Sequence, residues 1–166
     1  MPMSKSMDSL VLAYNRIDTL GNLSRAPNLT ILDVHNNKLS LLPEDISELT
    51  KLKTLKVSNN DLSDLDPRIS LLPDLVRINI EGNPLKSIKS SMRGAGAVEL
   101  KKYLKFRLSE DVVAKTEIDL SKEKGLPMSS NSYDAWDMFL REFTTNGQSL
   151  DLKNKNLNSL SPKIWL

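Results

Sequence analysis

Apolar residues between positions 7 and 85 recur in a fixed pattern that differs from helical spacing. In each copy two apolar positions lie two residues apart, an asparagine follows three residues later, and another apolar residue follows two residues after that. Alternation of this kind, as in Leu32-Asp33-Val34, predicts a short strand with one side in a core. The four copies place their asparagines in register, 22, 23 and 23 residues apart, at Asn15, Asn37, Asn60 and Asn83. A period of this length predicts a solenoid of stacked units, which we call coils.

The asparagines in register predict a structural role. An amide side chain both donates and accepts, so it can pair with backbone groups of adjacent coils that would otherwise be buried without a partner. The segments between the strands carry prolines, among them Pro43 and Pro67. Because proline cannot donate a backbone hydrogen bond, these return legs are expected to be irregular, 3₁₀ or short helical turns.

These positions resemble the leucine-rich repeat superfamily in its intracellular form with repeats of 22–23 residues, over residues 7–85. The resemblance implies an α/β solenoid: a curved parallel sheet with irregular, 3₁₀ or short helical convex legs. Residues 80–88 and 94–108 resemble the array end of a subgroup in which an interruption follows and repeats then resume. That subgroup would place further repeat sequence after the interruption.

A helix is predicted at residues 94–108, where Ala97, Leu100, Leu104 and Leu108 form one stripe at helical spacing. A solenoid ends in an open apolar surface, so we interpret this helix as a C-terminal cap on the array, residues 1–108. The alternative is a helix that binds a partner.

The same region is basic, with seven cations and one acid between residues 86 and 107. Such a run could hold nucleic acid or an acidic membrane surface. Charged residues are more often the solvated face of a helix that is buried on its other side, and two aromatics are too few for a base-stacking platform. The cations are Lys86, Lys89, Arg93, Lys101, Lys102, Lys105 and Arg107.

Residues 109–131 lack periodicity and predict a linker. Residues 132–166 predict a helix followed by a restarting partial repeat, in which Lys155 stands where asparagine is expected. The helix carries an apolar stripe that would be buried in a core or used for self-association. It consists of Trp136, Phe139, Leu140 and Phe143. We expect this helix and the strand near Leu150 to pack as a unit that begins a second array, meets another copy or partner, or covers residues 86–108.

Composition narrows the class of protein. The formal net charge of +2 argues against nucleic acid as the main partner, and no apolar stretch is long enough to span a membrane. The chain has no cysteine, which excludes disulfides and thiolate metal sites. Since extracellular repeat arrays usually carry stapled ends, we expect a cytoplasmic or nuclear location.

No catalytic, metal or cofactor site is predicted. His35 is the one histidine, and Asp33 lies two residues away without an accompanying nucleophile. Asp61, Asp64 and Asp66 alternate, but the glycine and final glutamate of a calcium loop are missing. The sequence therefore predicts no enzyme.

The predicted function is a protein-interaction module that binds a protein on the concave face of the sheet, and the resemblance allows either a scaffold or a regulatory subunit. A rigid curved surface of mixed charge suits a specific protein partner, since little ordering is needed on binding. The predicted concave residues are Val11, Ala13, Tyr14, Ile31, Asp33, His35, Asn36, Thr54, Lys56, Ser58, Asn59, Arg77, Asn79 and Glu81.

Overall fold

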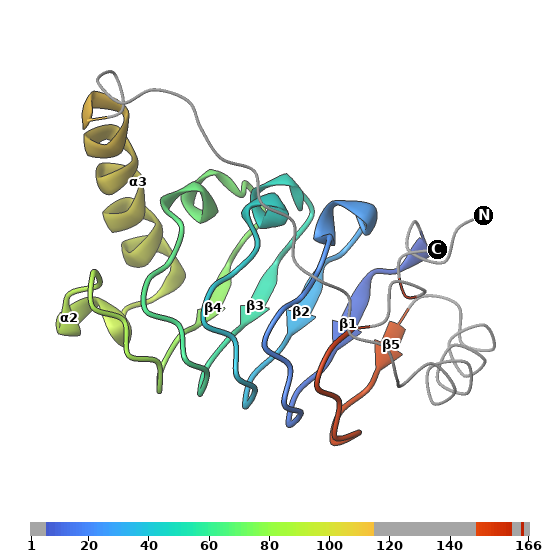
Figure 1. Ribbon diagram of the computed structural model, residues 1–166. Helices are drawn as coiled ribbons and strands as arrows, with labels where there is room; N and C mark the ends of the chain where they lie inside the picture. Colours follow the sequence, from blue (N-terminus) through green and yellow to red (C-terminus); the bar gives the residue numbers. More distant parts are fainter. Residues whose placement is uncertain (1–5, 115–148, 161–163, 165–166) are drawn as a thin grey trace.

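The computed structural model describes residues 6–114, 149–160 and 164, and it shows a five-stranded parallel sheet (Figure 1). The strands lie in the order β4-β3-β2-β1-β5. Each strand is three residues long, and the five are β1 (Ser9–Val11), β2 (Ile31–Asp33), β3 (Thr54–Lys56), β4 (Arg77–Asn79) and β5 (Ser149–Asp151). The predicted α/β solenoid fold is confirmed.

The register of the sheet follows the repeat pattern. Leu10 pairs with Leu32, Leu32 with Leu55 and Leu55 with Ile78, so the central apolar residue of each strand stands beside its counterpart. The period of two along a strand turns this residue into the core. Residues at equivalent positions of successive repeats therefore form continuous rows along the solenoid.

Short 3₁₀ helices form the return legs, as the prolines predict. They are η1 (Leu23–Arg25), η2 (Glu44–Glu48) and η3 (Pro67–Leu71). Pro43 immediately precedes η2, and Pro67 is the first residue of η3, where a missing N–H costs nothing. The Asp66 side chain caps η3 by accepting a hydrogen bond from the Arg68 backbone N–H at 2.8 Å.

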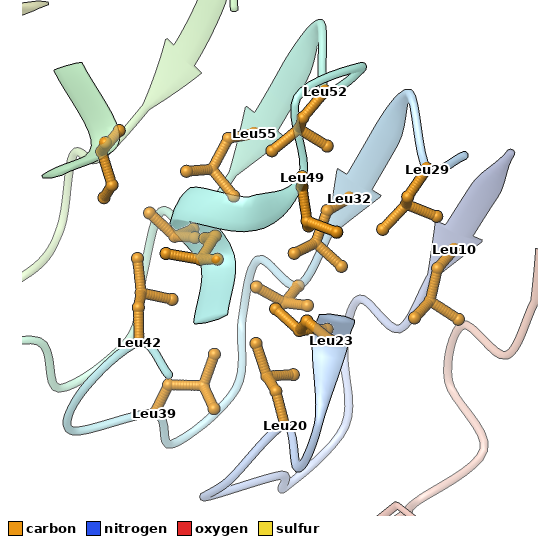
Figure 2. Close-up of a cluster of buried hydrophobic side chains, with 14 of the residues drawn as sticks. Leu10, Leu20, Leu23, Leu29, Leu32, Leu39, Leu42, Leu49, Leu52 and Leu55 are labelled. Carbon is orange, nitrogen blue, oxygen red and sulfur yellow. The ribbon is translucent and has the colours of Figure 1, made fainter. Parts of the chain in front are cut away.

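Aliphatic side chains fill the space between the sheet and the return legs (Figure 2). Leu32 and Leu55 of the strands meet Leu23 and Leu49 of the return legs, and all four are fully buried. Burying one leucine side chain stabilises a fold by roughly 1.5–3 kcal/mol relative to exposure. Because every coil shares this core with its neighbours, stability depends on stacking.

A short helix, α2 (Ser90–Arg93), leads into α3 (Ala97–Ala114), which lies at the β4 end of the sheet (Figure 1). Helix α3 packs against η3. Leu100 and Leu104 are fully buried, while Leu108 is half-buried. The helix begins three residues after the predicted start and continues six residues past the predicted end at 108. The apolar stripe located the buried part of the helix, whereas the additional turns lie beyond that stripe.

The partial repeat that follows the interruption lies at the opposite end of the sheet. Strand β5 pairs in parallel with β1, with Ser9 beside Ser149 and Leu10 beside Leu150. The segment thus covers the N-terminal end of the array, where β1 would otherwise be an unpaired edge, and it does not cover residues 86–108. The predicted helix that carries Trp136, Phe139, Leu140 and Phe143 lies outside the described residues.

Candidate functional site

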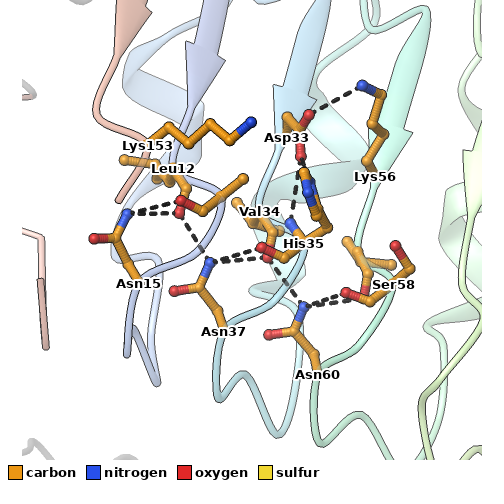
Figure 3. A network of polar contacts seen from close by, with 12 residues as sticks. Leu12, Asn15, Asp33, Val34, His35, Asn37, Lys56, Ser58, Asn60 and Lys153 are labelled. Carbon is orange, nitrogen blue, oxygen red and sulfur yellow. Dashed lines mark hydrogen bonds and ion pairs between the residues drawn. The ribbon is translucent and has the colours of Figure 1, made fainter. Parts of the chain in front are cut away.

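The asparagines in register form a ladder beside the sheet (Figure 3). The Asn37 side-chain N–H donates to the Leu12 carbonyl of the preceding coil at 2.9 Å and to its own coil at Val34 at 3.0 Å. Its Oδ1 accepts from the Ile17 backbone N–H at 3.0 Å. Asn60 and Asn83 repeat this arrangement, and all three side chains are buried. Each amide satisfies backbone groups that water cannot reach.

Asn15 makes the same bonds, but its partners come from the other end of the chain. Its side-chain N–H donates to the Leu152 carbonyl at 2.8 Å, and its Oδ1 accepts from the Leu157 backbone N–H at 3.0 Å. Residues 149–160, which we call the closing coil, therefore occupy the place of a coil preceding the first. The register of the asparagines predicts the ladder, but it carries no signal for this partner.

The predicted concave residues differ in accessibility. Tyr14 is 47% exposed and Ile31 38% exposed. Asn59, Arg77, Asn79 and Glu81 are also exposed, and a further group is half-buried. This half-buried group consists of Val11, His35, Asn36, Lys56 and Ser58. Three positions predicted to face a partner are buried instead, namely Ala13, Asp33 and Thr54.

Asp33 was expected to be exposed on the concave face, but it is buried and two neighbours hold its carboxylate. Its role in partner binding stays a prediction. The His35 Nδ1 contacts one carboxylate oxygen, and the Lys56 Nζ lies 3.0 Å from the other. Burial raises the pKa of Asp33, but the hydrogen bonds from His35 and Lys56 outweigh it and hold that pKa below its ordinary value. Asp33 thus positions His35 and Lys56 on the surface. Ala13 and Thr54 are buried as well.

Tyr14 links His35 to Lys153 of the closing coil. Its ring meets the His35 ring edge-on, with centroids 4.8 Å apart and planes at 78°. The Lys153 Nζ lies 5.1 Å from the centroid of the Tyr14 ring, within the range of a cation–π interaction. Lys153, Tyr14, His35, Asp33 and Lys56 form a continuous row over four adjacent coils, which we call the concave cluster.

Lys153 was absent from the predicted concave surface. It follows Leu152 as His35 follows Val34, so the pattern of the restarting repeat could have placed it on the same face. Its position beside Tyr14 depends on the pairing of β5 with β1, for which the sequence offers no local signal.

The backbone of Tyr14 is in the left-handed region, with φ at 57°. The residue before the ladder position shares this conformation in every coil: Asn36 (54°), Asn59 (53°), Gly82 (70°) and Asn154 (57°). Asparagine and glycine adopt it readily, whereas other residues pay roughly 1–2 kcal/mol. Tyr14 is therefore a costly residue at a position where the other coils carry tolerant ones.

Part of the basic run is used to hold α3 in place. Arg107 binds the Asp64 carboxylate through two bonds of 2.9 and 2.8 Å, and the Lys101 Nζ donates to the Leu72 carbonyl at 2.5 Å. Arg93 donates to the Leu85 and Ile88 carbonyls. Burial raises the pKa of Asp64, but the Arg107 guanidinium more than offsets this and keeps that pKa below its ordinary value. Three of the seven predicted cations thus have structural partners in the array or in the segment that leads into α2.

No cluster of three or more histidine, aspartate or glutamate side chains that could hold a metal ion occurs within residues 6–114 and 149–160. In the same part of the chain, no helix is both long and apolar enough to cross a membrane.

Residues 27–85 match the family model described as leucine rich repeat, which covers the second to fourth coils. The chain therefore contains a leucine-rich repeat domain. Repeats of this family generally serve as protein-interaction modules rather than as enzymes. No curated protein matches the chain, so the resemblance to a particular subgroup of the superfamily stays a prediction.

Proposed function

We propose that this chain is a non-enzymatic protein-binding module whose partner contacts the concave surface, with Tyr14 as the main anchor. The observation that carries the proposal is the strained backbone of Tyr14 in a position that the neighbouring coils fill with asparagine or glycine. Backbone strain persists where the surrounding structure enforces it, and such residues cluster at binding sites. In such a module the chain would act as a scaffold or as the regulatory subunit of a larger assembly.

The surroundings of Tyr14 suit an anchor residue. The residue is about half exposed, and contacts with His35 and Lys153 restrict the ring before any partner arrives. Tyrosine is enriched among the residues that dominate binding energy in protein interfaces. A side chain that is already ordered loses less entropy on binding.

The charge around the anchor favours a protein partner. Lys56 is paired with Asp33, while Arg77, Glu81 and Lys153 are exposed, so both signs occur on the surface. A partner that presents apolar, acidic and basic side chains would match it better than a uniformly charged polymer. The alternative is binding of nucleic acid or acidic membrane through residues 86–107, and three of the seven cations there are already bound to Asp64 or to backbone carbonyls of the chain. We place the protein inside the cell, in the cytoplasm or nucleus, on the basis of its cysteine-free sequence.

The test uses Tyr14→Asn, because strain and binding predict opposite effects. Asparagine accepts the left-handed backbone, so we expect the free energy of unfolding to stay unchanged or to rise by up to about 1–2 kcal/mol. Partners captured from a cell extract by the wild-type chain should be lost. Lys102→Ala, an exposed change on α3, is the matched control that should retain them. If Tyr14→Asn captures the same partners as the wild type, Tyr14 is not the anchor. If an Arg77→Glu variant also captures them, the partner does not bind the concave surface.

A further inference from the structure

The closing coil lies beside the first coil, although the two are far apart in the sequence. The second, third and fourth coils each follow their neighbour directly in sequence, whereas the closing coil begins 138 positions after Val11, at Ser149. Its place beside β1 must therefore come from the contacts alone. The β1 edge of the first coil therefore binds a coil that is distant in the sequence.

Those contacts are as complete as the contacts between consecutive coils. The Leu152 N–H donates to the Val11 carbonyl at 2.6 Å, and the Asn154 N–H donates to the Ala13 carbonyl at 3.0 Å. In the equivalent bonds between the second and third coils, the Val34 N–H donates to the Lys56 carbonyl at 2.8 Å and the Asn36 N–H donates to the Ser58 carbonyl at 3.0 Å. The bonds of Asn15 to the closing coil add two further contacts at 2.8 and 3.0 Å.

Apolar burial accompanies the hydrogen bonds. Leu150 is 3% exposed, Leu152 1% and Leu157 8%, so the closing coil contributes to the common core. A separate segment thus brings both a strand and buried leucines to the edge of the first coil. Strand addition of this kind takes its affinity from backbone bonds and its specificity from alternate side chains.

We propose that the edge of the first coil also accepts the closing coil of a second copy of this chain, which yields a dimer with exchanged coils. Helix α3 lies at one end of the sheet and β5 at the other (Figure 1). With neighbouring strands about 4.8 Å apart, the four steps from β4 to β5 cover roughly 19 Å. The 34 positions between Ala114 and Ser149 can extend to roughly 110 Å. The connection is long enough for the coil to reach either its own edge or that of a second copy.

The docking contacts are identical in the two arrangements, so chain concentration decides between them. A tethered segment competes at an effective concentration on the order of 1 mM. The closed monomer dominates at micromolar concentration, and the exchanged dimer becomes populated as the concentration approaches that value. In the dimer, Lys153 of one copy lies over Tyr14 of the other, so the concave cluster is built from two chains.

Cysteine trapping tests the exchange, because the natural chain contains no cysteine. Ser9 and Ser149 are register partners in adjacent parallel strands, a spacing that a disulfide can bridge. A chain with Ser9→Cys and a differently tagged chain with Ser149→Cys are mixed in a glutathione redox buffer. We expect the disulfide-linked heterodimer to increase by about tenfold or more between about 10 µM and about 1 mM chain.

Two controls make each outcome decisive. Ser40→Cys, at an exposed site in the second coil, replaces Ser149→Cys to measure disulfides formed by random collision. A chain with both Ser9→Cys and Ser149→Cys should close within one molecule at low concentration. If it closes but the mixed chains never exceed the Ser40→Cys control, the edge takes only its own coil and exchange is wrong. If it does not close, the docking surface itself is wrong. Neither result bears on partner binding at the concave surface, which the Tyr14→Asn experiment measures separately.

Discussion

The β4 end and the β1 end of the sheet are both covered, but by different kinds of element. At the β4 end, helix α3 follows the last coil closely in sequence and packs on η3, the return leg of the third coil, with buried leucines and the Arg107–Asp64 ion pair. At the β1 end, the closing coil comes from a distant part of the chain and adds a strand and ladder bonds. One end is therefore covered by side chains and the other by an extension of the sheet.

Covering an end with a helix and covering it with a coil differ in whether an unpaired strand edge remains. A helix satisfies its own backbone hydrogen bonds, so it can cover a core without presenting another unpaired strand. A coil completes the bonds of β1 but makes β5 the outermost strand of the described sheet. The closing coil carries Lys155 at its ladder position, in the turn that follows β5.

The largest expected loss of stability comes from a substitution in α3. Leu104→Ala should lower the free energy of unfolding by roughly 2–5 kcal/mol, because it removes a fully buried side chain from the cap. Denaturant melts of this variant and of Lys102→Ala, an exposed residue on the same helix, measure the difference. Leu150→Ala in the closing coil should cost less, since its effect is limited by the free energy of docking that coil. Equal midpoints for Leu104→Ala and Lys102→Ala would remove the basis for calling α3 a cap.

The next largest loss of stability is expected in the asparagine ladder, where a central position, Asn60, can be compared with a terminal one, Asn15. Asn60→Ala should cost about 1–3 kcal/mol, because it leaves the Leu39 N–H and the Val34 carbonyl buried without this partner. Asn15→Ala should shift the denaturant midpoint less and act mainly on the closing coil, whose Leu152 and Leu157 it binds. Hydrogen exchange should show faster exchange at residues 150–157 in Asn15→Ala. A uniform loss of protection across all coils in both variants would show that the closing coil is no separate unit.

The smallest effect concerns Lys155. Restoring the repeat consensus with Lys155→Asn should change the free energy of unfolding by less than about 0.5 kcal/mol, because the closing coil is outermost in the described sheet. The inverse change in the array, Asn37→Lys, should be far more damaging, since it places a charge at a buried position and removes three ladder bonds. Thermal melts of both variants provide the measurement. A stabilisation by Lys155→Asn comparable to the loss in Asn60→Ala would point to a further coil beyond β5.

Local spacing accounts for the successful predictions. The alternation around each strand, the asparagine three residues later and the prolines of the return legs act within one repeat or between adjacent repeats, so the fold could be predicted from them. The surface residues were harder to predict. Asp33 has the spacing of an exposed strand residue, yet its carboxylate is buried because His35 and Lys56 happen to flank it. Pairing of side chains across coils depends on geometry that the period alone does not specify.

The amino-acid sequence by itself determined the kind of coil, the number of coils in the array and the helix after them, because each depends on residues that are close in the chain. Only the tertiary structure decided which edge the last partial repeat covers. Its pattern of apolar residues fits any open coil, and the helix occupies the β4 end, so the β1 edge is the one left to receive it. That choice also placed Lys153 over Tyr14 and so completed the concave cluster.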